Sequence, residues 1–292
     1  MNKIIQVSLI IFIALGSFAC SDGINSGSEQ ADLDFMEPMT AALISEEGQD
    51  IRGKGVFILS WRNFHPRFMQ EATVRGTATA FGFEEETSLL PPHDHATTDM
   101  GTVRVESPAS ETVELRKTNS PLSGQKVYSS MVIGPFNGGS DLSFVSNGDF
   151  LFDVSGSQFF PSLELSISAP SELVTITTPS ESSLDQLSVD LNLRWNSNTE
   201  RPVGIFIRPA VQFNKGEKPQ RPDHENSEMI ILKDHDGSYT LSHDLLSKVA
   251  SHSDENRVHI SVGQLQFQDL KVEGETYRVI TRTDDSLQIR LD

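Results

Sequence analysis

Apolar and polar residues alternate in short runs along most of this chain, and Gly, Pro, Asn, Asp and Ser separate the runs. After Gly53 this period of two residues is typical of antiparallel strands that bury one face. The clearest run extends from Val189 to Trp195, where alternate side chains should point to opposite faces. The apolar set expected to face a core is Val189, Leu191, Leu193 and Trp195.

The pattern predicts strands throughout the chain and very little helix. In the first half the expected strands are Gly55–Trp61, Thr73–Phe81, Thr102–Glu106, Thr112–Arg116, Lys126–Ile133, Phe150–Val154 and Leu163–Ser168. In the second half they are Leu173–Thr178, Ser188–Trp195, Gly204–Val211, Glu228–Leu232, Tyr239–Leu241, Arg257–Phe267, Thr276–Thr281 and Ser286–Leu291. Ser242 is a suitable N-cap for a short helix ending at Ala250, and Asp236-Gly237 predicts a tight hairpin turn.

Regularly spaced short strands favour an all-β fold built from β-sandwiches. The expected architecture is two tandem antiparallel β-sandwich (Ig-like) domains after a signal peptide and a flexible tether. The boundaries we expect are 1–19 for the signal peptide, 20–50 for the tether, 51–170 for the first sandwich and 171–292 for the second. The tether is rich in Ser, Gly, Asp and Glu, and its one weakly apolar patch, from Met36 to Leu43, could instead dock as a short helix.

Composition and charge exclude one class of partner. The chain has 292 residues, of which 37% are hydrophobic and 22% charged, so its body can bury a core. Its formal net charge is −18, and no stretch gathers Lys and Arg into a basic face. A nucleic-acid binder needs such a face to displace counterions. We therefore expect no nucleic-acid partner, and we interpret the acidity as a source of solubility.

The first residues have the organisation of an export signal. Lys3 supplies a positive start, the apolar run Ile4 to Phe18 follows, and small residues lead to Cys20. The run is short for a membrane span, which needs about twenty apolar residues. Cys20 is the sole cysteine, and an unpaired thiol is unusual in a chain bound for an oxidising compartment. The alternative is an ordinary signal peptide cleaved after Ala19, leaving a free thiol.

The ending Gly16-Ser17-Phe18-Ala19-Cys20 resembles a bacterial lipobox, although Ser17 stands where a leucine is usual. The resemblance implies lipidation of Cys20, with palmitate among the acyl groups, and membrane attachment through that lipid. Ser21 follows in place of the aspartate that resembles an inner-membrane retention signal. This implies the cell envelope, at the outer membrane, on either its periplasmic or its exposed side.

A second resemblance covers the chain from about Tyr128 onward. The residues that carry it are Phe150 to Val154, Phe159-Phe160-Pro161, Ser168-Ala169-Pro170, Leu191 to Asn196 and Gly237 to Leu241. Their order resembles uncharacterised secreted proteins and outer-membrane lipoproteins of Gram-negative bacteria with Ig-like or fibronectin-III-like modules. The resemblance implies fold and location, and it assigns no activity.

The loop Pro91-Pro92-His93-Asp94-His95 is the most suggestive place for chemistry. In an extended segment His93 and His95 would point to one side, and with Asp99 they could hold Zn²⁺ or a similar ion. The alternative is a solvated polar loop. We keep a metal-binding protein or metal-dependent enzyme as one alternative function.

Aromatic side chains could form a surface for sugars, and Trp61 is the candidate because Arg62, Phe64 and His65 lie close to it in the chain. Core packing is the competing role for Trp61. No Gly-x-Ser-x-Gly or His-Glu-x-x-His motif, P-loop or dinucleotide fingerprint is present.

The sequence therefore predicts a lipid-anchored protein that is not an enzyme and uses no cofactor. Its expected role is binding, adhesion or envelope structure, with an unidentified protein or glycan ligand. A carbohydrate-binding module using Trp61 is the other alternative.

Overall fold

The computed structural model describes residues 51–64, 73–89, 96–119, 126–130, 142–180, 183–210, 226–253 and 255–292. Across these residues the chain forms strands and one short helix, so the all-β class is confirmed. The predicted lipidation site Cys20 and the predicted metal ligands His93 and His95 lie outside the described residues.

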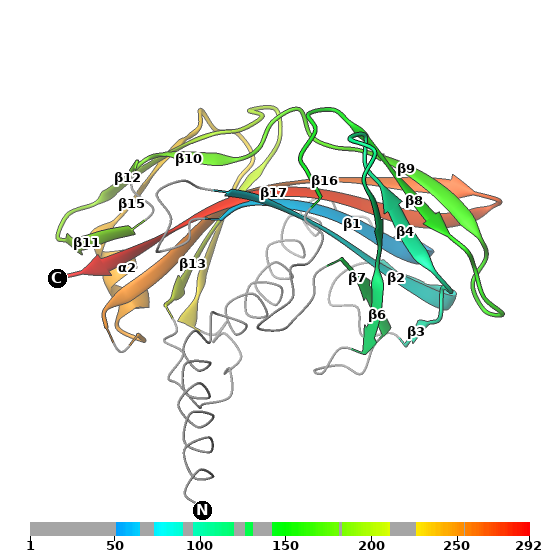
Figure 1. Ribbon diagram of the computed structural model, residues 1–292. Coiled ribbons are helices and arrows are strands. Elements are labelled where there is room, and N and C mark those ends of the chain that lie inside the picture. Colours follow the sequence, from blue (N-terminus) through cyan, green and yellow to red (C-terminus); the bar gives the residue numbers. More distant parts are fainter. Residues whose placement is uncertain are drawn as a thin grey trace, which may run out of the picture.

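A ten-stranded sheet forms the base of the molecule (Figure 1). Its main path, in spatial order, is β14 (Glu228–Leu232), β13 (Val203–Pro209), β16 (Arg257–Val272), β17 (Glu275–Leu291), β1 (Arg52–Phe64), β2 (Thr73–Ser88), β7 (Lys126–Ser129) and β6 (Arg116–Asn119). Off this path, β11 (Ser183–Leu187) pairs with β17, and β3 (Thr97–Thr98) pairs with β2. The pairs β1–β17 and β11–β17 are parallel. The hairpin of β16 and β17 runs across the whole molecule and joins its two ends.

Two smaller sheets lie over the same face of this base (Figure 1). One has the order β5 (Thr112–Glu114), β4 (Val103–Glu106), β8 (Asp149–Val154), β9 (Leu163–Ser168), and the other β10 (Thr175–Thr178), β12 (Leu191–Asn196), β15 (Ser238–Leu241). On β17, Tyr277 packs under the first sheet and Ile289 under the second. Both are odd-numbered, and side chains two apart on a strand share a face. We call this the upper face.

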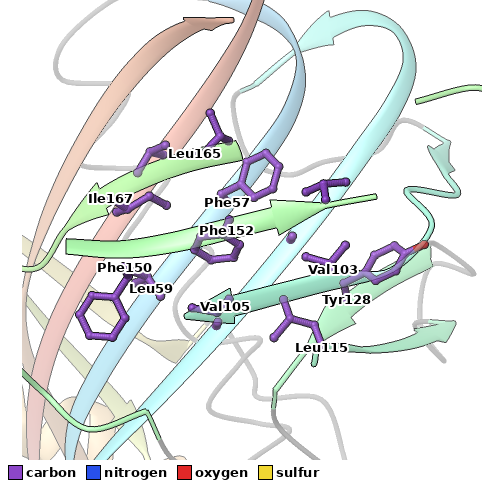
Figure 2. Packing of buried hydrophobic residues seen from close by; sticks show 14 of the residues in the cluster. Phe57, Leu59, Val103, Val105, Leu115, Tyr128, Phe150, Phe152, Leu165 and Ile167 are labelled. Carbon is purple, nitrogen blue, oxygen red and sulfur yellow. The ribbon is translucent and has the colours of Figure 1, made fainter. Parts of the chain in front are cut away.

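The first upper core lies between the four-stranded sheet and strands β1 and β2. Figure 2 shows Phe150, Phe152, Leu165 and Ile167 pointing toward Phe57 of β1 and its neighbours. The Phe57 and Phe152 rings meet edge to face, with centroids 5.3 Å apart. These side chains are almost fully buried, so apolar burial is the main stabilising term for this end.

The second upper core lies under the three-stranded sheet and is closed by α2 (His243–Ala250). The expected cap is confirmed, because the Ser242 side chain accepts a hydrogen bond from the Leu245 N–H. Buried Leu246, Val249 and Ala250 join α2 to the core. In the part of the chain that the structure describes, no helix is long and apolar enough to cross a membrane.

A third cluster of buried apolar residues lies on the opposite, lower face of the base sheet. It consists of Val56, Phe83, Leu89, Phe206, Leu265 and Ile280. Phe206 and Ile280 are even-numbered residues of β13 and β17, whereas the upper cores take the odd-numbered neighbours in each strand. The base sheet is therefore apolar on both faces, as expected for a sheet buried between layers.

The segment that leads from one upper sheet to the other is fixed to the middle of the base sheet. The Asn63 amide donates to the Val174 carbonyl at 3.0 Å, and Thr283 Oγ1 accepts from the Val174 N–H at 3.3 Å. Asp285 Oδ2 accepts from the Ile176 N–H at 2.8 Å. These three side chains satisfy backbone groups that would otherwise be buried without partners.

The two upper cores divide the chain near residue 170, while the base sheet combines strands from both predicted ranges, 51–170 and 171–292. The division into two domains therefore stays a prediction. The first core takes Tyr277 and Val279 from the end of the chain because the β16–β17 hairpin extends beneath it.

Two local expectations are wrong. Val189 is 62% exposed, because β12 begins only at Leu191 and the residues before it lie outside the strand. Gly237 has the positive φ of a turn (80°), but this turn is not a hairpin. It leads from β14 in the base sheet to β15 in the upper three-stranded sheet, so the flanking strands do not pair.

Candidate functional site

Asp99 is the one predicted metal ligand that the structure describes, and its carboxylate already has partners. Oδ2 accepts from Lys117 Nζ at 2.6 Å, and Oδ1 accepts from the Tyr128 hydroxyl at 2.7 Å and the Gly101 N–H at 3.0 Å. The hydrogen bond from Lys117, followed by that from Tyr128, lowers the pKa of Asp99 far below its usual value. Burial, followed by the bond to Asp99, raises the pKa of Tyr128 to about 12.

These contacts give Asp99 a structural role at the end of the first core. The Tyr128 hydroxyl also accepts from the Met100 N–H, so the pair ties the chain before β4 to β7. Among the described residues, no three His, Cys, Asp or Glu side chains are grouped so that they could hold a metal ion. The proposed site with His93 and His95 stays a prediction.

Trp61 is fully buried in the first upper core and presents no ring face to solvent. Its indole packs against Phe150, with centroids 5.2 Å apart, and Nε1 donates to the Leu142 carbonyl at 3.2 Å. Gly76 lies opposite Trp61 on β2, and a Cβ there would fall 2.8 Å from the indole. The structure therefore supports core packing for Trp61 and shows no stacking surface for a sugar.

The lower face of the base sheet carries a group of charged residues that the sequence analysis did not single out. We call it the Asp284 cluster, and it consists of Arg62, Arg208, His259, Arg282 and Asp284. Strand pairing places Arg62 opposite Asp284 and Arg208 opposite His259, and the charges of Arg208, Arg62 and Asp284 all act on His259. The strands involved, β13, β16, β17 and β1, are four consecutive strands of the base sheet.

Asp284 is the acidic member of the cluster, and its side chain is completely buried. Arg62 Nε donates to Asp284 Oδ2 at 2.6 Å, and Arg282 Nε lies 3.5 Å from Oδ1. A buried carboxylate needs such partners because loss of hydration disfavours its charged form. Arg62 comes from the neighbouring strand β1, and Arg282 lies on β17 itself, two residues before Asp284.

His259 is held in its neutral form. Burial lowers the pKa of His259 well below its usual value, and the positive charges of Arg208 and Arg62 lower it further. Asp284 acts in the opposite direction but does not compensate. The imidazole is therefore a neutral hydrogen-bonding group.

A second ion pair extends this surface toward the apolar cluster. Arg278 donates from Nε to Asp269 Oδ1 at 2.9 Å and from Nη2 to Oδ2 at 3.1 Å, a two-point geometry that guanidinium groups favour. Its guanidinium carbon lies 5.4 Å from the centre of the Phe267 ring. The lower face thus alternates paired charges with apolar side chains.

The Asp284 cluster stabilises the lower face of the base sheet. Its three guanidinium groups all have partners, and Arg62 is paired with Asp284, because arginine donors match the geometry of carboxylate oxygens. The neutral imidazole adds a donor or acceptor without changing the charge. The sequence contained one signal for this cluster. The polar run Arg282-Thr283-Asp284-Asp285 lies between two predicted strands, and the structure joins those strands into the single strand β17.

Comparison with known proteins identifies no family for this chain, since no protein family and no curated protein matches it. The yeast delta-COP-I mu-homology domain is a similar solved structure, at 13% identity and a TM-score of 0.27, covering 80% of this chain and 97% of that chain. The FN1–FN3 domains of chicken CNTN1 are 10% identical with a TM-score of 0.18, covering 81% and 67%. Both TM-scores are too low to support an argument about fold or function.

Proposed function

We propose that this protein is a lipoprotein of the bacterial cell envelope, anchored in the outer membrane through acyl groups on Cys20. The observation that carries the proposal is the position of the sole cysteine, directly after Ala19 at the end of the apolar leader. A lone thiol in an exported chain is explained when it receives a lipid. Thioether attachment to diacylglycerol would remove the reactive group and supply the anchor.

We further propose that the body serves binding, adhesion or envelope structure and performs no catalysis. The support is architectural: two upper sheets pack on one face of a shared base sheet, in the manner of sandwiches. Each half of the body would then be an Ig-like or fibronectin-III-like module, the kind found in the Gram-negative secreted proteins and lipoproteins that the sequence resembles. The carboxylates of Asp99 and Asp284 support this role, because both are engaged in joining segments of the fold.

Metabolic labelling tests the anchor directly. Cells that express the full chain are grown with radiolabelled palmitate, and the membrane and soluble fractions are separated. We expect label in the wild-type protein, found with the outer membrane, and none in a Cys20→Ala variant, which should accumulate as unprocessed precursor. Ser21→Ala is the matched control at the neighbouring position and should remain labelled. Mass spectrometry that finds a mature N-terminus without acyl groups would overturn the proposal.

The residue after the cysteine tests the membrane. Ser21→Asp introduces the residue that resembles an inner-membrane retention signal, so this variant should keep its label and move to the inner-membrane fraction. Identical fractionation of Ser21→Asp and Ser21→Ala would contradict the outer-membrane assignment while leaving lipidation intact.

A further inference from the structure

The lower face of the base sheet is buried, but the described layers of the fold lie on the other side. The described members of the third cluster come from strands of the base sheet and from residues that flank them. Val56 is 0% exposed and Phe206 is 3% exposed. Both upper sheets and α2 pack into the upper cores instead. A sheet face of this kind needs a second layer to exclude water.

We propose that the segment Met36–Ile44 supplies this layer by packing on the third cluster, so that part of the predicted tether belongs to the folded body. The first argument is continuity of the chain. Ile51 packs against the third cluster, and its carbonyl accepts a hydrogen bond from the Leu89 N–H at 2.9 Å. The chain therefore enters β1 beside this face.

Distance and composition agree with the assignment. The residues from Ser45 to Asp50 can span at most about 20 Å when extended, which keeps the segment within reach of the cluster. The large apolar residues of the segment are Met36, Met39, Leu43 and Ile44. Flexible methionine side chains fill irregular apolar surfaces well.

Charge supplies the second argument. Residues 21–50 contain no Lys or Arg, and their acidic residues are Asp22, Glu29, Asp32, Asp34, Glu37, Glu46, Glu47 and Asp50. The Asp284 cluster, on the same face as the third cluster, contains three arginines, which already have partners, and one carboxylate. An acidic segment that crosses this surface therefore meets no concentration of negative charge.

The stretch 131–136 is also apolar, and it is the main competitor for this face. Its flanking residues are tied to β2, because the Ser130 N–H donates to the Ala78 carbonyl and the Leu142 N–H donates to the Gly76 carbonyl. Leu142 then packs in the first upper core. Ser130 and Leu142, the described residues on either side of 131–141, therefore lie beside the upper core, while Ile51 leads onto the lower face.

The consequence for the membrane anchor rests on the proposed lipidation of Cys20. If Cys20 carries the lipid and Met36–Ile44 is docked, only residues 21–35 remain as spacer, and the body lies correspondingly closer to the membrane surface. The docking itself is independent of lipidation and can be tested without it.

Hydrogen exchange measured by mass spectrometry tests the docking in the mature chain, residues 20–292 with Cys20→Ser. We expect amides of peptides spanning 36–44 to exchange at least about tenfold more slowly than in a free peptide of that sequence. Met39→Asp with Leu43→Asp should abolish this protection, since it places charge on the apolar segment. Ser26→Asp with Ser28→Asp adds the same charge upstream and should leave the protection unchanged.

Each remaining outcome is decisive. Unprotected exchange of 36–44 in the parent chain overturns the proposal, whatever the variants do. Protection that disappears on dilution would assign the lower face to a second copy of the chain and would also overturn it. Failure of palmitate labelling, with protection of 36–44 retained, would remove the anchor and keep the docking.

Discussion

Asp284 and Asp285 are consecutive residues of β17, yet their carboxylates act on opposite faces of the base sheet. Asp284 pairs with Arg62 on the lower face, at 2.6 Å, whereas Asp285 accepts the Ile176 N–H on the upper face, at 2.8 Å. Both residues are 1% exposed. Because successive side chains of a strand point to opposite faces of its sheet, these two neighbouring acids stabilise different layers. Each can be tested separately.

Replacing Asp285 should weaken the junction between the upper sheets and the base sheet. Asp285→Ala leaves the Ile176 N–H without its acceptor, and we expect the free energy of unfolding to fall by about 2 kcal/mol or more. Urea denaturation followed by circular dichroism measures the change. Glu164→Ala removes an exposed carboxylate from β9 and should change stability by less than about 0.5 kcal/mol. Equal effects of the two variants would contradict the role given to Asp285.

His259 should make the protein less stable in mild acid. Its pKa in the folded state lies well below that in the unfolded chain, because burial and then Arg208 disfavour the cation. Below about pH 6.5 the unfolded chain takes up a proton that the folded protein does not, so stability falls by up to about 1.4 kcal/mol per pH unit from this residue.

Unfolding measured between pH 5 and pH 7 tests this dependence on pH. His259→Gln should give a shallower decline than the wild type, whatever its stability at pH 7. His252→Gln, at an exposed position after α2, is the control and should retain the wild-type slope. Parallel curves for His259→Gln and the wild type would show that His259 is not the source.

Asp99 should contribute stability near neutral pH that is lost in strong acid. Its folded pKa is depressed by Lys117 and Tyr128, so its contribution is complete above the ordinary carboxyl pKa of about 4 and is lost as pH falls toward the folded value. The stability gap between wild type and Asp99→Asn should therefore be largest near neutral pH and shrink below about pH 4. Urea titrations at pH 7 and at pH 3 measure it, and a gap that grows in acid would contradict the assignment.

Truncating Trp61 should destabilise the first upper core. The side chain is fully buried, so Trp61→Ala should lower the free energy of unfolding by about 3–5 kcal/mol, and Trp61→Phe by less. Phe159→Ala is the control, because Phe159 is 49% exposed. A folded Trp61→Ala variant of wild-type stability that loses binding on a glycan array would restore the ligand-surface interpretation.

The alternating pattern located most of the described strands because each buries one face and exposes the other. β9 and β12 are good examples, with every second residue buried. The helix cap at Ser242 could be predicted for the same reason, because it needs only the Ser242 hydroxyl oxygen and the backbone N–H of Leu245, three residues later. Prediction failed in β17, where residues 283–285 are polar and buried. Their partners come from distant strands, which a single window of sequence does not contain.

By itself the sequence determined the fold class, most strand positions, the short helix and the candidate anchor at Cys20, because these depend on local periodicity and short motifs. Only the tertiary structure decided that β14 and β15 belong to different sheets, that β1 lies parallel to β17, and that Arg62 meets Asp284. Strand pairing and sheet stacking depend on contacts between residues hundreds of positions apart, and alternation along one strand does not specify which strand will be its neighbour.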